Sequence, residues 1–165
     1  MTTLPSGVRV ERVPVARTYP LRALVLRPHA PEHVRLPADD RPDTAAFAAL
    51  DGDEVVGTAV AFPEACPWRP AVAGAWRLRG MATAPDRQAT GVGGAVLAAV
   101  LDHVAAAGGT LVWCNARTTA RRFYERAGFQ AHGEEWVDPD IGPHVAMWRP
   151  VGPASPRGRT AAGAG

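Results

Sequence analysis

The feature that most constrains the fold is the stretch Arg79–Gly94, in which a predicted strand runs through a glycine-rich loop straight into a predicted helix. The loop ends on Gly91, Gly93 and Gly94, and we expect the helix to run from Ala95 to Ala107. A helix N-terminus carries unpaired backbone N–H groups and the positive end of the helix dipole, so it favours phosphate. Glycine lets a diphosphate approach the backbone without meeting a Cβ. The stretch therefore predicts a site for a phosphorylated cofactor.

The spacing of the glycines disfavours the two best-known nucleotide-binding loops. A Walker A loop needs Gly-Lys-Ser/Thr, and all eighteen basic residues of this chain are arginine. A dinucleotide-binding fingerprint needs a third glycine three residues after Gly93, where this chain has Val96. Nucleotide or NAD binding is therefore disfavoured, and an ordinary glycine-rich turn between a strand and a helix is the simpler alternative.

A second motif follows the apolar run Leu111–Cys114 and ends in Phe-Tyr-x-x-x-Gly-Phe, at Phe123–Phe129. Together with Gln-x-x-Gly-x-Gly, at Gln88–Gly93, this motif resembles the acetyl-CoA loop and the following strand and helix of the GCN5-related N-acetyltransferase (GNAT) family. The resemblance covers about Val8 to Arg149 and is strongest from Trp76 to Phe129. Two signatures in the right order are more specific than either one alone.

The order of strands and helices predicts an α/β (α+β) architecture. The resemblance makes it specific: a GNAT fold with a central, mixed, mostly antiparallel sheet of about seven strands flanked by helices. It further implies that the parallel pair Trp76–Thr83 and Leu111–Cys114 splays apart to admit the pantetheine arm of CoA. We assign residues 1–149 to this single domain and residues 150–165 to a disordered tail.

Several further elements follow from the apolar patterning and the turn residues. A helix beginning near Pro20 places Leu21, Leu24 and Val25 on one face, and residues 28–43 form a long loop. Thr118 or Thr119 is expected to cap the helix that carries Phe123 and Tyr124. The remaining strands are predicted at Val8–Val13, Ala45–Leu50, Val55–Phe62, Gln130–Val137 and His144–Trp148.

Composition limits the classes of partner. At 165 residues with 47% hydrophobic residues, the chain can bury a substantial core as one domain. A net charge of +2 is too small to indicate nucleic acid. No signal peptide or membrane-spanning run is visible, and Cys66 and Cys114 have no metal-ligand spacing. We expect a cytoplasmic protein with no metal, no membrane and no nucleic-acid partner; its oligomeric state stays open, with a homodimer among the alternatives.

The resemblance implies a set of residues that bind acetyl-CoA as a cosubstrate. Loop amides would hold the diphosphate, and the backbone of Met81 and Thr83 would pair with the pantetheine amides as another strand does. This reading is compatible with Met81 and Ala82 being plain core residues, because only their backbone binds. The implied residues are Met81, Ala82, Thr83, Gln88, Ala89, Thr90, Gly91, Val92, Gly93, Gly94, Asn115, Ala120, Phe123 and Tyr124.

Tyr124 stands at the family's position for the residue beside the CoA sulfur. A phenol, with an unperturbed pKa of about 10, is a suitable acid for protonating a leaving thiolate. The alternative is that Tyr124 only packs beside Phe123 on the buried face of its helix.

The residue that takes the proton of the amine is harder to assign. Many family members carry a glutamate on the strand before the glycine loop, but Trp76–Gly80 contains no carboxylate. The nearest replacements are Glu134, Glu135 and His144, since the last two strands approach the acceptor side in this fold. Histidine suits a base at neutral pH. There are two alternatives to His144 as the base. The histidine can be hydrogen-bonded for a structural role only, or a water molecule can take the proton in place of a side chain.

The leading function is transfer of the acetyl group of acetyl-CoA directly to a primary amine of a small molecule or peptide. The alternative is a catalytically silent acyl-CoA-binding sensor or partner module, which the missing strand glutamate favours. Two tryptophans, Trp68 and Trp136, and two acids, Asp138 and Asp140, indicate an amphipathic, cationic acceptor.

Overall fold

A seven-stranded mixed sheet organises the chain in the computed structural model, which describes residues 4–152. The strand order is β1-β2-β3-β4-β5-β7-β6, and all neighbours are antiparallel except β4 and β5. This confirms the expected fold. The elements are β1 (Val8–Val13), η1 (Val15–Thr18), α1 (Tyr19–Leu26), η2 (Pro31–His33), η3 (Pro37–Asp40), β2 (Ala45–Asp51), β3 (Glu54–Pro63), β4 (Ala75–Thr83), η4 (Pro85–Arg87), α2 (Val92–Ala106), β5 (Leu111–Arg117), η5 (Thr118–Ala120), α3 (Arg121–Arg126), β6 (Gln130–Asp138) and β7 (Gly142–Pro150).

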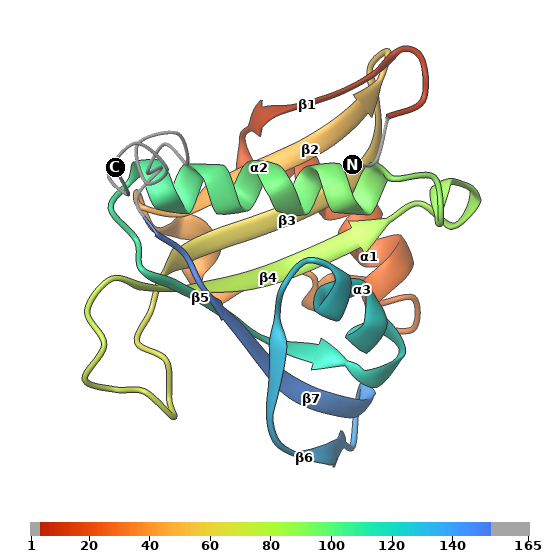
Figure 1. Cartoon of the computed structure of the whole chain (residues 1–165). Coiled ribbons are helices and arrows are strands. Elements are labelled where there is room, and N and C mark those ends of the chain that lie inside the picture. Colours follow the sequence, from red (N-terminus) through yellow and green to blue (C-terminus); the bar gives the residue numbers. More distant parts are fainter. Residues whose placement is uncertain (1–3, 153–165) are drawn as a thin grey trace.

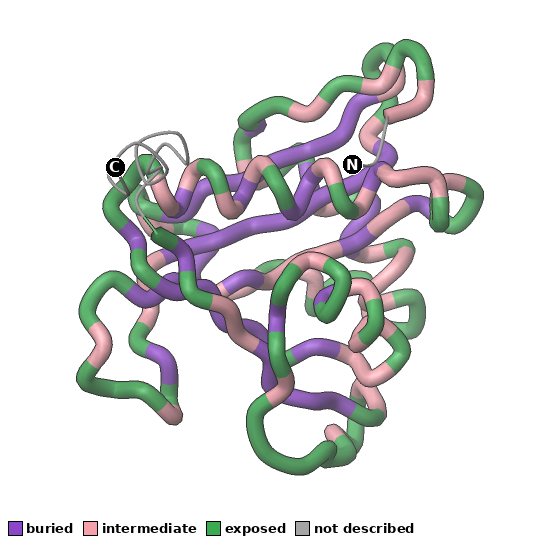
Figure 2. Tube along the Cα trace, viewed as in Figure 1, coloured by how far each residue is buried: buried purple, intermediate pink, exposed green. Residues whose placement is uncertain are grey.

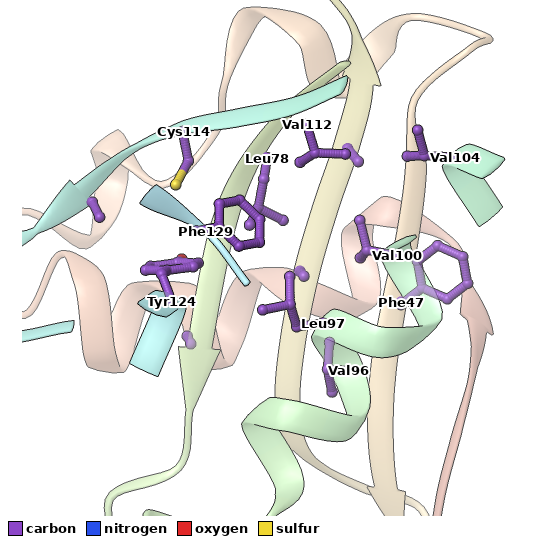
Figure 3. Packing of buried hydrophobic residues seen from close by; sticks show 14 of the residues in the cluster. Phe47, Leu78, Val96, Leu97, Val100, Val104, Val112, Cys114, Tyr124 and Phe129 are labelled. Carbon is purple, nitrogen blue, oxygen red and sulfur yellow. The ribbon is translucent and has the colours of Figure 1, made fainter. Parts of the chain in front are cut away.

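The helices lie on both faces of the sheet (Figure 1). Helix α2 crosses β2 and β3 on one face, and α1 packs on β3 and β4 from the other. The buried residues run along the central strands and the inner face of α2, whereas the outer face of α2 is exposed (Figure 2). Figure 3 shows this core, with Val96, Leu97 and Val100 of α2 packed over the sheet. None of the helices within residues 4–152 is long and apolar enough to cross a bilayer.

The parallel pair β4 and β5 opens into a fork. The two strands pair only over Ala75–Arg77 and Leu111–Trp113, and beyond these residues they diverge (Figure 1). Strand β4 also bulges at Gly80, which has φ +62°, where the pairing of β3 with β4 shifts register. The fork and the bulge leave the edge of β4 that faces β5 without a strand partner after Arg77.

A buried ion pair supports the bulge from the side of α1. The Arg22 guanidinium donates to both carboxylate oxygens of Asp39, at 3.3 and 3.0 Å, and to the Val34 carbonyl at 2.7 Å. A Cβ on Gly80 would lie 3.3 Å from Cδ of Arg22, so this side chain packs directly against the bulge. Burial of the pair therefore ties α1 and η3 to β4 at the fork.

Several element boundaries differ from the sequence-based expectations. Helix α2 begins at Val92, three residues earlier than predicted, because Gly91 with φ +91° turns the chain into the helix at that point. The loop 28–43 contains η2 and η3, and Leu24 is 61% exposed although it was expected on the buried face of α1. Strand β5 continues to Arg117, and α3 is preceded by the turn η5 with no side-chain cap.

The end of the domain also differs from the expectation. Pro150 closes β7, and Val151 is buried with its N–H donated to the Thr110 carbonyl at 2.8 Å. The fold therefore extends two residues beyond 149, because Val151 fills the core where β5 begins. The remainder of the predicted tail, from residue 153, lies outside the described residues.

Candidate active site

A cleft of about 1540 Å³ occupies the fork between β4 and β5. Its walls come from the end of β4, the loop before α2, the first turns of α2, the end of β5, α3, and the connection between β6 and β7. Of the residues implied by the family resemblance, the lining includes Met81, Ala82, Thr83, Gln88, Ala89, Gly91, Gly93, Gly94, Asn115, Ala120, Phe123 and Tyr124. His144, one of the three candidate replacements for the family's base, lines the cleft as well.

The glycine-rich loop presents the N-terminus of α2 to this cleft. Ala89 and Gly91 have φ of +62° and +91°, so the backbone winds tightly before the helix begins. A Cβ on Gly93 would lie 3.1 Å from Oγ1 of Thr83 and 3.2 Å from Cε1 of Phe123. A Cβ on Gly94 would meet nothing within 4 Å. Gly93 therefore allows close packing, whereas Gly94 leaves open space over the first N–H groups of α2, which fits a diphosphate.

The end of β4 presents a backbone edge to the same cleft. Its other edge pairs with β3, through Gly57 with Thr83 and Thr58 with Ala82. On the side of the fork, the Met81–Thr83 backbone is free of β5. Such an edge can accept an extended, amide-bearing chain as an added strand. The pantetheine arm of CoA has this character, so the residues fit the cosubstrate.

Two residues of the implied set point away from the cleft. The Thr90 hydroxyl donates to the Arg87 carbonyl within its own turn. Val92 is fully buried, and a Cβ on Gly57 of β3 would lie 2.8 Å from its Cγ1. Since α2 starts earlier than predicted, the side chain of Val92 faces the sheet. The sequence analysis assigned Thr90 and Val92 a role through their loop amides, and that role stays a prediction, because neither side chain lines the cleft.

Tyr124 lines the cleft but is only 5% exposed. Its ring packs edge-on against Phe123 and Phe129, at centroid distances of 5.1 and 5.3 Å. Figure 3 shows it below the Cys114 sulfur. Burial, with a smaller contribution from that thiol, raises the pKa of Tyr124 well above its usual value, and burial raises the pKa of Cys114 to about 12. The phenol is therefore held in its protonated form.

His144 of β7 lines the cleft and is paired across the sheet with Arg117 and Trp136. Its Nδ1 is 2.7 Å from the Gly142 carbonyl, which can only accept, so Nδ1 carries the proton. In the neutral ring, Nε2 then has a free lone pair. The ring stacks on Trp136 with centroids 5.8 Å apart. Asp138, also in the lining, has its pKa lowered chiefly by the Asp140 N–H, with a smaller contribution from His144.

The two glutamates considered as bases lie elsewhere. Glu134 and Glu135 are exposed, and Glu135 pairs with Arg121 at 3.5 Å. Neither side chain lines the cleft. A register shift in the pairing of β6 with β7, between His132 and Trp136, changes which residues face the cleft at this point. The structure therefore brings His144 to the cleft and leaves Glu134 and Glu135 outside its lining.

Sequence reasoning missed a group of arginines in the cleft. Arg27, Arg77, Arg79 and Arg117 line the cleft, and Arg117 is paired with His144 across β5 and β7. The alternation Arg77-Leu78-Arg79 was a usable signal, because residues two apart on a strand share a face. Leu78 is in the core beneath α2, so the two arginines face the side of α1. By contrast, Trp68 does not line the cleft and stacks on His132.

Comparison with known proteins agrees with this geometry. Residues 15–129 match the family model described as "Acetyltransferase (GNAT) family". The chain therefore belongs to the GNAT acetyltransferase family. Its described residues carry the family's fork, glycine loop and tyrosine helix.

Individual relatives extend over most of the chain. "Uncharacterized N-acetyltransferase YitI" of Bacillus subtilis (strain 168) is 29% identical over 143 residues, which cover 86% of this chain and 95% of that protein. An acyl-CoA N-acyltransferase from Pseudomonas aeruginosa has a similar structure, with TM-score 0.69, 19% identity, and coverage of 86% and 99%. An aminoglycoside 6'-N-acetyltransferase solved with coenzyme A gives TM-score 0.66 and 18% identity, with coverage of 90% and 99%.

Proposed function

We propose that this protein transfers the acetyl group of acetyl-CoA to a primary amine of a small molecule or peptide. The observation that carries the proposal is the fork, which brings the open N-terminus of α2, the unpaired edge of β4 and Tyr124 to one cleft. Bound acetyl-CoA would supply an activated thioester. The chain's own residues then have to hold it, orient the amine beside it and handle two protons.

Binding and orientation fall to backbone groups. The first N–H groups of α2 stabilise the diphosphate, and the Met81–Thr83 edge aligns the pantetheine arm. Fixing the thioester and the amine in one geometry provides much of the rate enhancement of a direct transfer. The rigid sheet on either side of the fork suits this role.

Tyr124 acts as the general acid in this proposal. As the C–S bond of the thioester breaks, the sulfur gains negative charge, and the phenol donates its proton to that sulfur. Burial raises the pKa of Tyr124, so the proton is present over the whole physiological range. The phenolate that forms would be disfavoured in its apolar surroundings, so it is reprotonated before the next turnover.

His144 acts as the general base. Because Nδ1–H is engaged with the Gly142 carbonyl, Nε2 is the atom that accepts a proton from the amine. The Asp138 carboxylate, which lies in the same lining, stabilises the positive imidazolium that results. A proposed cytoplasmic location agrees with Cys66 and Cys114 being free thiols.

The test is consumption of acetyl-CoA over a panel of amines, with products identified by mass spectrometry and propionyl-CoA as a second donor. Turnover that requires both an amine and acetyl-CoA supports the proposal. CoA binding without turnover of any amine would instead favour the alternative of a silent acyl-CoA-binding module, which the absence of a carboxylate in Trp76–Gly80 favours.

A further inference from the structure

Arg79 is a half-buried arginine whose side chain lines the cleft. Among residues 4–152, the Arg79 guanidinium has no hydrogen-bond or ion-pair partner, and its nitrogen atoms are not sealed from solvent. Burial and the nearby charges of Arg77 and Arg27 lower its pKa to about 10, so it still carries its charge at neutral pH. Its unpaired N–H donors are therefore open to the cleft and available to an anion.

Arg27 lies near Arg79, and Arg117 lies near Arg27; the hydrogen-bond donors of both are only partly used. Each donates one hydrogen bond to the Leu26 carbonyl, at 2.9 and 2.8 Å. A guanidinium has five N–H donors, so both retain donors for another acceptor. Arg27 is close enough to Arg79 and to Arg117 to lower the pKa of each. We call Arg27, Arg79 and Arg117 the arginine cluster.

A small pocket opens beneath the arginine cluster. It has a volume of about 50 Å³, and Arg27 and Arg79 line both this pocket and the main cleft. The remaining lining comes from α1, from the 33–36 segment and from Gly80. The pocket has room for more than one water-sized group. An oxyanion at the junction of the two cavities would therefore reach guanidinium groups from α1 and from β4.

Negative charge to balance the cluster is scarce in this part of the described structure. Asp138 is the acidic residue among those lining the cleft, and its Oδ1 already accepts the N–H groups of Asp140 and Ile141, at 2.8 and 3.1 Å. Glu64 pairs with Arg77 at 3.1 Å. The acceptor end of the cleft therefore carries net positive charge, which disfavours the cationic acceptor expected from sequence.

We propose that the arginine cluster binds an anionic group of the acceptor, so that the substrate is an amine bearing a carboxylate or a phosphate. This inference rests on the proposed acetyl transfer at the same cleft. The anion would sit on the side of α1, and the amine would then point toward His144 and the fork. Arginine suits both oxyanions, because its planar donors form charge-assisted, often bidentate hydrogen bonds.

The experiment compares amines that differ only in the anionic group: β-alanine with β-alaninamide, and phosphoethanolamine with ethanolamine. Turnover is followed by release of CoA, and binding to the CoA-loaded protein by calorimetry. We expect at least one anionic member to be preferred by about 10- to 100-fold, the equivalent of one or two charge-assisted hydrogen bonds. The two pairs distinguish a carboxylate from a phosphate.

The variant Arg79→Gln separates recognition from folding. It should lower kcat/KM for the anionic amine by far more than kcat/KM for its neutral partner, so that the preference disappears. It should not lower Tm, because Arg79 has no hydrogen-bond or ion-pair partner among residues 4–152. Arg9→Gln is the control, because it removes the same charge from β1 at the far edge of the sheet. It should leave the preference for the anionic amine unchanged. Equal use of charged and neutral amines, or an equal loss for both in Arg79→Gln, overturns the inference. Binding of the anionic amine that depends on Arg79, without any turnover, would support the cluster and overturn only the proposed acetyl transfer.

Discussion

Arg22 of α1 and Asp39 of η3 form an ion pair at 3.0 Å, with side-chain exposures of 1% and 0%. Asp39→Ala leaves the Arg22 guanidinium buried without its counter-charge, so we expect the free energy of unfolding to fall by about 3–5 kcal/mol. Urea denaturation measures this loss. Asp40→Ala is the matched control, because its pair with Arg35 is 64% and 78% exposed. Asp40→Ala should lower the free energy of unfolding by at most about 1 kcal/mol. Similar losses in the two variants would contradict the expectation that the buried pair matters more than the exposed one.

The glycine loop is tested best at Gly94, where a Cβ meets no atom within 4 Å. Gly94→Asp places a negative charge where the diphosphate would bind, so the affinity for acetyl-CoA should fall by 10-fold or more, on the order of one lost charge-assisted contact. An acidic residue in the first turn of α2 also stabilises the helix, so folding is preserved. Gly94→Asn supplies a neutral side chain of the same size. Equal affinities of the two variants in calorimetry would rule out the charge argument.

Tyr124→Phe should lower kcat by about 10²-fold, the usual scale for loss of a general acid. The ring packing on Phe123 and Phe129 is retained, so acetyl-CoA affinity should change little. Tyr19→Phe removes the other phenol of the chain and serves as the control. If Tyr124→Phe kept its kcat in single-turnover kinetics, Tyr124 would be a packing residue only.

His144→Gln should remove the rise of kcat/KM with pH that accompanies deprotonation of the base. The amide keeps polarity and similar size but does not titrate. His132→Gln is the control, since that exposed ring stacks on Trp68 outside the cleft. If His144→Gln kept a similar kcat/KM and the same fall in kcat/KM at low pH, His144 would not be the base, and a bound water would take that role.

Stability should fall as the pH rises above about 9, because of Cys114. Its folded-state pKa is raised from 9.0 to about 12, so between these values the unfolded state loses the thiol proton and the folded state keeps it. The folded state then binds more protons, so the free energy of unfolding decreases with pH, by up to about 1.4 kcal/mol per unit from this one group. Urea denaturation at pH 8, 9 and 10 measures the effect. The free energy of unfolding should fall less steeply with pH in Cys114→Ala than in the unmodified protein. An equally steep fall in the two proteins would show that the Cys114 thiol does not cause the loss of stability.

The fold was predictable because its determinants are local. The Asp-Gly turn, the glycine loop and the period of α2 each depend on neighbouring residues, and their order defines the family topology. Boundaries were less accurate where backbone geometry decided them. Gly91 adopts a left-handed conformation that starts α2 at Val92, which moved Val92 from the loop to the core.

The sequence did not predict the arginine cluster, because its residues come from elements far apart in the chain. Arg27 follows α1, Arg79 is on β4 and Arg117 ends β5, so only the folded chain brings them together. Glu135 was predicted from the position of its strand, but the register shift in β6 leaves it exposed beside Arg121. His144 lines the cleft and its role as a base stays a prediction, whereas its hydrogen bond to the Gly142 carbonyl depends on the local turn.

The short pairing of β4 with β5 has a mechanical consequence. Three residue pairs join the β1–β4 half of the sheet to the half that contains β5, β7 and β6. An extended cosubstrate lying along Met81–Thr83 would continue the hydrogen-bond ladder where the protein's own ladder stops. The bound cosubstrate would then stabilise the two halves of the sheet against each other. Hydrogen–deuterium exchange of the β4 and β5 amides should therefore slow when CoA binds. Substrate binding and the rigidity of the sheet are thus coupled through the same few backbone groups.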